Sequence, residues 1–507
     1  MEERHLQKRL KCVTDYETNI HEILKQCSPN FDVLYVNFRY DEICLALDRF
    51  RQLGITLKTL LEFQLKVNCL MPWNVEYSSM RLNVNRRFNF FPLLIIMAEC
   101  DEDIIQAYQF AQKYKIEISL RSGSHCFENF SLCTGMVIDQ SRRTRVRIDP
   151  ETKTYTMEAG ALIGPVVDAL SKYSLAIPVG SCVNNGLSLF SCGGGVSYLN
   201  RFWGTNSDNI IEAQILLADG KIHTVNSRKH KDLYFALRGA GIGNYGIVVS
   251  LKCQAYEIAD VYIFTLTYKF SDLEEILPRW TNWITTIPLN LTSDITIIGG
   301  KGNIYVNGYY LGSSKCKLEA ELEQLTRFVA PSKTFIEKTT FVNGIRAFAG
   351  KGRWYPFFKF KNGFLKSPWS VSSPAISIIR EFMSQGDEHN YLTIDSLGGA
   401  LDKTPARATA FVHRFADGWC HFNAQWFNQE QAAEKLGWTQ KFYKELAPYL
   451  SFETYQNAPD ITLDHYLERY YGENLPRLVR IKRKYDPKNI FQYEQSIPPV
   501  LPSVKQN

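Results

Sequence analysis

Two loops of this 507-residue chain carry a nucleophilic side chain among residues that let a backbone approach a ligand closely. The first loop runs from Arg121 to Ser131 and presents His125 among glycine and serine residues. The second runs from Gly180 to Gly195 and presents Cys182 ahead of three consecutive glycines. Glycine adopts backbone conformations that other residues avoid, so each loop can lie against a ligand. An imidazole nitrogen and a cysteine sulfur can each form a covalent bond to an electrophile.

The composition of the first loop suits a dianionic pyrophosphate group. Successive backbone amides in a Gly/Ser-rich turn bind such a group without burying a cationic side chain. A loop of this composition is, by itself, usually an ordinary turn. The histidine inside it is what favours a cofactor site. The residues expected to contribute beside His125 are Arg121, Ser122, Gly123, Ser124, Asn129 and Ser131.

The second loop has a specific register, because glycines stand four and eleven residues after Cys182. Together with the histidine loop, this register resembles the berberine bridge enzyme-like branch of the vanillyl alcohol oxidase/p-cresol methylhydroxylase (PCMH) superfamily, over residues 81 to 499. The resemblance implies FAD held bicovalently, with His125 bonded to the flavin 8α carbon and Cys182 to C6. The alternative for Cys182 is a small buried hydrophobic residue. The cofactor-binding positions implied in this loop are Gly180, Cys182, Gly186 and Gly193.

A third glycine-rich stretch, Arg238 to Val248, has the spacing of a dinucleotide-binding motif. The Rossmann alternative fails on context, because that motif follows a strand and opens a helix. Here residues 232–238 have a helical pattern before the glycines, and residues 247–258 have a strand pattern after them. The stretch resembles the family segment ALRGGGGGNFGIV, which packs against flavin. This resemblance assigns four residues to the cofactor wall: Gly243, Asn244, Gly246 and Val248.

Hydride removal from an alcohol needs a base aimed at the flavin, and it needs no metal. The resemblance places that base on the sheet of the substrate domain. His421 stands five residues before Trp426, where relatives often have Glu or Gln, and His413 belongs to a His-Arg pair that normally supports the cleft. The alternative for a strand histidine is a core or surface role. The candidate catalytic residues are His421, Tyr455 and His413, and no metal-ligand spacing occurs.

The segment from Tyr455 to Asp460 resembles the family pattern Tyr-x-Asn-Tyr-x-Asp, which implies a flavin-side contact for Asn457. Ala458 replaces the second tyrosine, which is often the proton acceptor. Further departures cluster beside the cysteine, including Asn185 where a branched apolar residue commonly controls oxygen access. The cofactor signature is therefore kept better than the catalytic one. The other departures are Val183 in place of proline, and Ser188, Leu189 and Phe190 in place of Gly-Gly-His.

Two strand-helix-strand units deliver the two loops to one cleft. Residues 91–99, 101–115 and 117–124 have strand, helix and strand patterns and lead into the histidine loop. A second unit has a strand over 152–160 and a helix over 164–174, with Pro165 in its first turn, and leads into the cysteine loop.

A broad antiparallel sheet is predicted between residues 260 and 426. Its strands are expected at 261–270, 295–300, 304–312 and 408–415, with helices near Leu273–Ile284 and Lys317–Phe328. The expected fold class is α+β, with a two-part PCMH-type FAD-binding domain and a substrate domain whose sheet is covered by helices. The predicted divisions are an N-terminal extension (1–80), the FAD-binding domain (81–257), the substrate-binding domain (258–454), a C-terminal segment that returns to the FAD domain (455–499) and a tail (500–507).

Composition and apolar patterning argue against several classes of binding partner and of cellular location. A net charge of +6 from 58 basic and 52 acidic side chains is too balanced to favour nucleic acid or an anionic membrane. The first residues lack the apolar stretch of a secretory signal, and no apolar run is long enough to cross a membrane. Twelve scattered cysteines without a CxxC pair fit neither a zinc site nor a dense disulfide framework. We therefore expect a soluble protein of a reducing cytosol, or of a host cytosol if it is delivered there.

Three functions remain open. The first is oxidation of an alcohol, either a sugar or a secondary metabolite, with molecular oxygen as acceptor and hydrogen peroxide as product. The second is a dehydrogenase with another acceptor, because Asn185 changes the oxygen-access position. The third is a flavin-bearing scaffold or effector whose residues 1–80 bind a protein partner, motivated by Ala458 and the extension.

Overall fold

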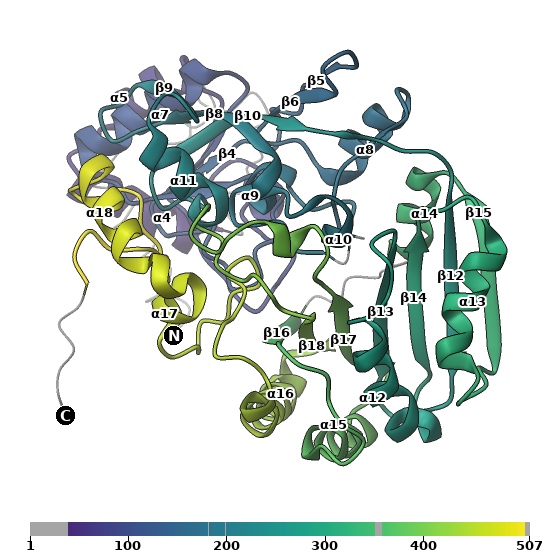
Figure 1. Cartoon of the computed structure of the whole chain (residues 1–507). Coiled ribbons are helices and arrows are strands. Elements are labelled where there is room, and N and C mark those ends of the chain that lie inside the picture. Colours follow the sequence, from purple (N-terminus) through teal and green to yellow (C-terminus); the bar gives the residue numbers. More distant parts are fainter. Residues whose placement is uncertain (1–38, 181, 198, 350–356, 502–507) are drawn as a thin grey trace.

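The computed structural model describes residues 39–180, 182–197, 199–349 and 357–501. We call the part of the chain predicted to bind FAD the FAD-binding half, and the part predicted to bind the substrate the substrate half. The FAD-binding half begins with a four-stranded sheet of order β1-β2-β4-β3, in which β2, β3 and β4 are parallel and β1 is antiparallel to β2. Helices lie around this sheet (Figure 1). Its elements are α4 (Tyr40–Gln52), α5 (Leu57–Gln64), β1 (Cys69–Leu70), α6 (Tyr77–Met80), β2 (Leu94–Met97), α7 (Asp101–Tyr114), β3 (Ile118–Arg121) and β4 (Met136–Asp139).

A second, five-stranded antiparallel sheet follows, with order β5-β6-β10-β8-β9. Helices lie between several of its strands along the chain, and β7 and β11 form a separate two-stranded sheet. The elements are β5 (Val146–Asp149), β6 (Thr154–Glu158), α8 (Ile163–Ser171), β7 (Leu175–Ala176), α9 (Leu187–Cys192), α10 (Asn200–Trp203), β8 (Ile210–Leu216), β9 (Ile222–Asn226), α11 (Lys231–Ala240), β10 (Ile247–Gln254) and β11 (Tyr256–Glu257).

The substrate half is one seven-stranded antiparallel sheet of order β15-β12-β14-β13-β17-β18-β16. Helices α12, α13, α15 and α16 lie against it (Figure 1). Neighbouring helices contact one another in the order α13-α12-α15-α16. The elements are β12 (Val261–Tyr268), α12 (Leu273–Trp283), β13 (Leu291–Ile298), β14 (Ile304–Tyr310), α13 (Lys315–Thr326), β15 (Lys333–Thr339), α14 (Phe341–Phe348), β16 (Phe357–Leu365), α15 (Pro374–Gln385), β17 (Asn390–Ser396), β18 (Gly418–Trp426) and α16 (Ala432–Leu446).

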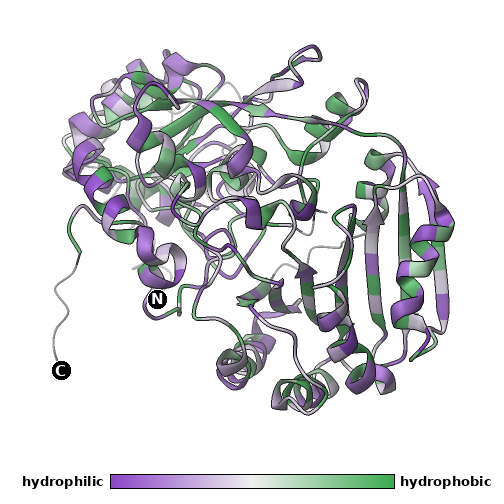
Figure 2. Ribbon diagram, in the orientation of Figure 1, coloured by the Kyte–Doolittle hydropathy of each residue, from purple (hydrophilic) through white to green (hydrophobic). Residues whose placement is uncertain are grey.

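The strands of this sheet alternate between hydrophobic and hydrophilic residues along their length (Figure 2). Because successive side chains of a strand point to opposite faces, the alternation separates two faces. Ile295, Ile394 and Phe422 belong to the core beneath the helices. Their neighbours Asp294 and Asp395 face the other way, into a cavity toward the FAD-binding half. The period of two thus makes one face a core and the other a polar cavity wall.

The chain returns to the FAD-binding half after α16 through α17 (Tyr466–Tyr471) and α18 (Leu475–Tyr485). Helix α18 packs on α11, and the buried Lys482 Nζ donates a hydrogen bond of 2.7 Å to the carbonyl of Asn244. The α+β prediction is confirmed, with antiparallel sheets covered by helices. Residues 1–38 of the predicted extension lie outside the described residues, whereas α4 and α5 share a hydrophobic core with β2 and α7.

One predicted strand is wrong. Residues 408–415 form no strand, although their apolar residues alternate. The backbone of this segment pairs instead with the end of α11, where Phe411 N donates to Arg238 O and Ala410 N donates to Phe235 O. Alternation in a short segment cannot tell a strand from an extended chain packed on a helix, and tertiary contact with α11 decided the outcome.

Candidate active site

The histidine loop and the cysteine loop touch through their glycines. A Cβ added at Gly123 would lie 2.4 Å from Gly186 N, and one added at Gly186 would lie 2.6 Å from Ser122 Oγ. Real Cβ atoms do not approach other atoms so closely, so both positions require glycine. The contact brings two segments about sixty residues apart in sequence to one place. It explains how His125 and Cys182 come to line the same cavity.

We expect Gly186→Ala to lower the free energy of unfolding by about 1 to 3 kcal/mol, because its methyl group would overlap the histidine loop. Gly437→Ala is the matched control, since a Cβ there meets nothing within 4 Å and the residue lies inside α16. That control should be neutral or stabilising by about 0.5 to 1 kcal/mol. Urea unfolding of both variants tests the contact. Equal stability of the two variants would contradict it.

The cavity between the halves has a volume of about 720 Å³, within the range of sites for sizeable organic ligands. Burial lowers the pKa of His125 to about 4, so its imidazole is neutral at pH 7 and can act as a nucleophile. Burial and the charge of Asp395 raise the pKa of the Cys182 thiol to about 11, although this side chain is exposed to the cavity. Cys182 therefore has to lose its proton as it forms a bond.

The histidine loop has the backbone geometry of a phosphate-binding turn. Ser124 and Asn129 adopt left-handed conformations, with φ of 53° and 68°. Turns that mix right- and left-handed residues make concave anion sites from backbone amides. The buried Ser197 Oγ also lines the cavity and has no hydrogen-bond partner in the described part of the chain. These features fit FAD, whose phosphates and ring polar groups need such partners.

The structure divides the predicted cofactor residues into two groups. One group lines the cavity: Arg121, Ser122, Gly123, Ser124, His125, Ser131, Gly180, Cys182, Gly186 and Asn457. The other lies behind the lining: Asn129, Gly193, Gly243, Asn244, Gly246 and Val248. Asn244 is buried and accepts a hydrogen bond of 2.8 Å from Ile497 N, which ties the C-terminal segment to this wall. Ile242, two residues before Asn244, lines the cavity.

His421 of β18 reaches the cavity from the substrate half. Its Nε2 lies 3.7 Å from Asp395 Oδ2, and its ring stacks on Phe360 with centroids 5.0 Å apart. The side chain is 12% exposed, and Nδ1 is buried without a hydrogen-bond partner among the described residues. The imidazole is thus held by packing, with Nε2 as the atom nearest the carboxylate of Asp395.

Tyr455 and Asn457 support the glycine-rich loop. The hydroxyl of Tyr455 accepts hydrogen bonds from Gly195 N (2.8 Å) and Val196 N (3.0 Å), and a third of 2.8 Å from Asn457 Nδ2. Burial raises the pKa of Tyr455 far above its usual range. The hydroxyl oxygen of Tyr455 thus already accepts three hydrogen bonds from the protein. A Cβ at Gly193 would lie 1.7 Å from Asn457 Oδ1, so the amide packs directly on that glycine.

His413 is not part of the described cavity lining. It is completely buried, with Nδ1 3.2 Å from Glu453 and Nε2 3.1 Å from Gln456 Oε1. Gln456 in turn donates to the carbonyl of Gly193. Because both ring nitrogens are engaged inside the protein, the geometry gives His413 a supporting position for the C-terminal segment and no contact with a substrate.

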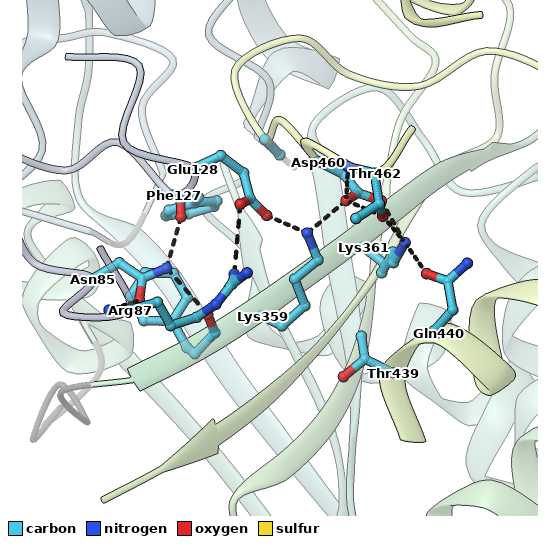
Figure 3. Close-up of polar contacts among 12 residues, drawn as sticks. Asn85, Arg87, Phe127, Glu128, Lys359, Lys361, Thr439, Gln440, Asp460 and Thr462 are labelled. Carbon is cyan, nitrogen blue, oxygen red and sulfur yellow. Dashed lines mark hydrogen bonds and ion pairs between the residues drawn. The ribbon is translucent and has the colours of Figure 1, made fainter. Parts of the chain in front are cut away.

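A buried ion network connects three segments around the cavity (Figure 3). Lys359 of β16 forms ion pairs with Glu128, which lies three residues after His125, and with Asp460 of the C-terminal segment. Lys361 binds the second oxygen of Asp460. The lysines hold the pKa of Asp460 at about 2 against the effect of its burial. The network fixes the histidine loop to the substrate sheet.

Replacing Lys359 with Met should lower the free energy of unfolding by about 3 to 5 kcal/mol, because Glu128 would be left without its lysine and Asp460 with one lysine fewer. Lys315→Met is the control, since its pair with Glu319 on α13 is about half exposed and should contribute about 0 to 1 kcal/mol. Chemical denaturation gives both values. A loss at Lys359 no larger than the loss at Lys315 would show that the network has no stabilising role.

Several cavity residues were missed by the sequence argument. They are Asp294 of β13, Asp395 and Tyr391 of β17, and Asn423 and Gln425 of β18. The signal that could have found them is polar residues in every second position of strands that are otherwise apolar. Within the described ranges, no three His, Cys, Asp or Glu residues are grouped so as to hold a metal ion, and no helix there is long and apolar enough to span a membrane.

Comparison with known proteins identifies both the flavin half and the closing segment. The family described as FAD binding domain matches residues 92–226, and the family described as berberine and berberine like matches residues 454–498. An uncharacterised FAD-linked oxidoreductase of Bacillus subtilis, YgaK, is 32% identical over 440 residues, covering 85% of this chain and 96% of that protein. A second one from this bacterium, YvdP, is 29% identical over 433 residues, covering 83% and 96%.

Solved structures show the same architecture. Wild-type BBE-like 1 of Physcomitrella patens superimposes with a TM-score of 0.81 at 26% identity, covering 86% of this chain and 98% of that one. The fold thus defines a PCMH-type FAD-binding protein in which a second, antiparallel sheet faces the FAD-binding half across the cavity. The chain belongs to the berberine bridge enzyme-like family of FAD-linked oxidoreductases.

Proposed function

We propose that this protein oxidises an alcohol to a carbonyl compound, with FAD bonded to His125 and Cys182 and with molecular oxygen reduced to hydrogen peroxide. FAD supplies the two-electron acceptor for the hydride of the carbinol carbon. The observation that carries the proposal is that His125, Cys182 and His421 line one cavity. The first two come from the FAD-binding half, and the third comes from the sheet that faces it.

His421 is proposed as the base. The distance of 3.7 Å between Nε2 and Asp395 Oδ2 is too long for a direct hydrogen bond, and a substrate hydroxyl can lie between the two atoms. Nε2 accepts the hydroxyl proton, and the carboxylate of Asp395 stabilises the imidazolium that forms. Ala458 does not leave the reaction without a base, because His421 also lines the cavity and can take this role.

Purified protein tests this function directly. We expect protein that stays yellow after acid precipitation, a flavin that is bleached by an alcohol or sugar substrate without air, and one hydrogen peroxide formed per alcohol oxidised. Colourless protein, or a flavin that no alcohol in a broad panel reduces, would contradict the proposal.

A dehydrogenase that uses another acceptor is the second candidate, favoured by the polar Asn185 in the cavity lining. Mixing photoreduced protein with aerated buffer separates the two, because an oxidase regains its yellow colour within seconds. Slow recovery combined with fast turnover of an artificial dye would establish the dehydrogenase. A scaffold that binds a partner through residues 1–80 would show neither activity, and its partner should be lost when those residues are deleted.

A further inference from the structure

Two carboxyl groups face the cavity from neighbouring strands. Asp294 of β13 and Asp395 of β17 are directly opposite each other in the antiparallel register. Directly opposed residues have Cβ atoms about 4.5 to 5.5 Å apart. Both side chains are nearly buried, at 7% exposure, and both line the cavity. The substrate sheet therefore presents two carboxyl groups at one point.

The protein brings little positive charge to this pair. Asp294 accepts hydrogen bonds from neutral groups, Asn307 Nδ2 at 3.1 Å and Thr296 Oγ1 at 3.3 Å. The only Arg or Lys in the described cavity lining is Arg121, which is paired with Asp139 in the FAD-binding half. Burial and the charge of Asp395 raise the pKa of Asp294 to about 8. Asp294 therefore holds a proton at pH 7, and a cation bound between the two carboxyl groups would compensate Asp395 and favour the ionised form of Asp294.

A second observation shows that the same wall needs hydrogen-bond donors. Asn423 is 2% exposed and lines the cavity. Its Nδ2 donates a hydrogen bond of 3.0 Å to the Tyr391 hydroxyl, whereas its Oδ1 is buried without a partner among the described residues. A buried acceptor without a donor is costly unless a ligand supplies the donor. The sheet wall thus offers a ligand both negative charge and an acceptor oxygen.

Two other ligands fit this wall less well. A neutral polyol could satisfy the hydrogen bonds, but it would leave the charge of Asp395 uncompensated. A divalent cation usually takes six or more oxygen ligands, and the described residues group no three His, Cys, Asp or Glu side chains for one. A protonated amine supplies both the positive charge and up to three donors.

We propose that the cavity selects alcohols that also carry a protonated amine, with the ammonium group bound between Asp294 and Asp395. Because Asp395 also lies 3.7 Å from His421, the amine and the reacting hydroxyl should be only a few bonds apart in the substrate. This inference rests on the proposed alcohol oxidation for the identity of the reacting group, but the binding preference itself does not require turnover.

The test measures binding of matched probes to the flavin-containing protein by titration calorimetry without oxygen. The probes are glucosamine against glucose, and 2-amino-1-phenylethanol against 1-phenylethanol, which keeps the alcohol and lacks the amine. We expect wild-type protein to bind the amine of at least one pair about tenfold more tightly or better. Asp294→Asn should reduce that ratio to about threefold or less, because it removes one carboxylate.

Asp260→Asn is the matched control, an exposed carboxylate at the outer end of the same sheet, and it should keep the wild-type ratio. Equal binding of amine and neutral probe in both pairs would overturn the inference, as would a ratio that survives Asp294→Asn. Turnover of neutral alcohols without any amine preference would overturn the inference and leave the proposed function intact. Amine-selective binding without turnover of any alcohol would support the inference and contradict the proposed function.

Discussion

We expect a variant in which His125 and Cys182 are both replaced by Ala to release all of its flavin when it is precipitated with acid. Each single variant should keep its flavin, because the remaining residue would still hold the ring. The structural basis is that the two loops meet at Gly123 and Gly186 and present both side chains to one cavity. The neutral imidazole of His125 and the thiol of Cys182 are the two nucleophiles that the expected attachment needs.

Cys126→Ala is the matched control for this experiment. Cys126 adjoins His125 and also lines the cavity, but the resemblance gives it no bond to flavin. Mass spectrometry of tryptic peptides should find one flavin joined to the peptides of His125 and Cys182 in wild-type protein. If His125→Ala alone released the entire flavin, attachment would be through one bond only. Free flavin from wild-type protein would refute both bonds.

A variant with His421→Asn should lose about 10² to 10⁴-fold in kcat/KM, the range that a general base typically contributes. Asparagine fills a similar volume but cannot take the hydroxyl proton. The flavin should remain attached, because the proposed bonds to it come from His125 and Cys182 and not from His421. Stopped-flow reduction of the flavin without oxygen measures the affected step directly.

His223→Asn is the control, since this histidine lies on the β8-β9 hairpin and pairs with Asp219 there. It should leave the rate of flavin reduction unchanged. A decrease of less than about threefold in the rate of flavin reduction for His421→Asn would exclude His421 as the base.

The residues that could be found from sequence are those whose role is indicated by a short segment of the chain. The glycine two residues before His125 and the glycine four residues after Cys182 indicate a close backbone contact. The structure shows that contact between Gly123 and Gly186. The helix-before, strand-after context of the third glycine stretch is confirmed by α11 and β10. Local context also excluded the Rossmann alternative correctly.

The residues that were missed depend on pairing between distant strands. Asp294 and Asp395 are about one hundred residues apart, and only the register of β13 with β17 makes them neighbours. The same holds for Glu128, Lys359 and Asp460, whose charges meet only after the two halves have packed. Taken alone, each of these residues is one polar residue in a strand or loop.

The sequence by itself determined the α+β class and the two nucleophile-bearing loops, because backbone conformation and side-chain periodicity are local properties. The motifs in those loops carried the resemblance to the family. The tertiary structure decided that residues 408–415 pack on α11 instead of joining the sheet, that His413 is enclosed while His421 reaches the cavity, and that two carboxyl groups meet there. Those outcomes depend on which surfaces bury each other, and burial is a property of the whole packed chain.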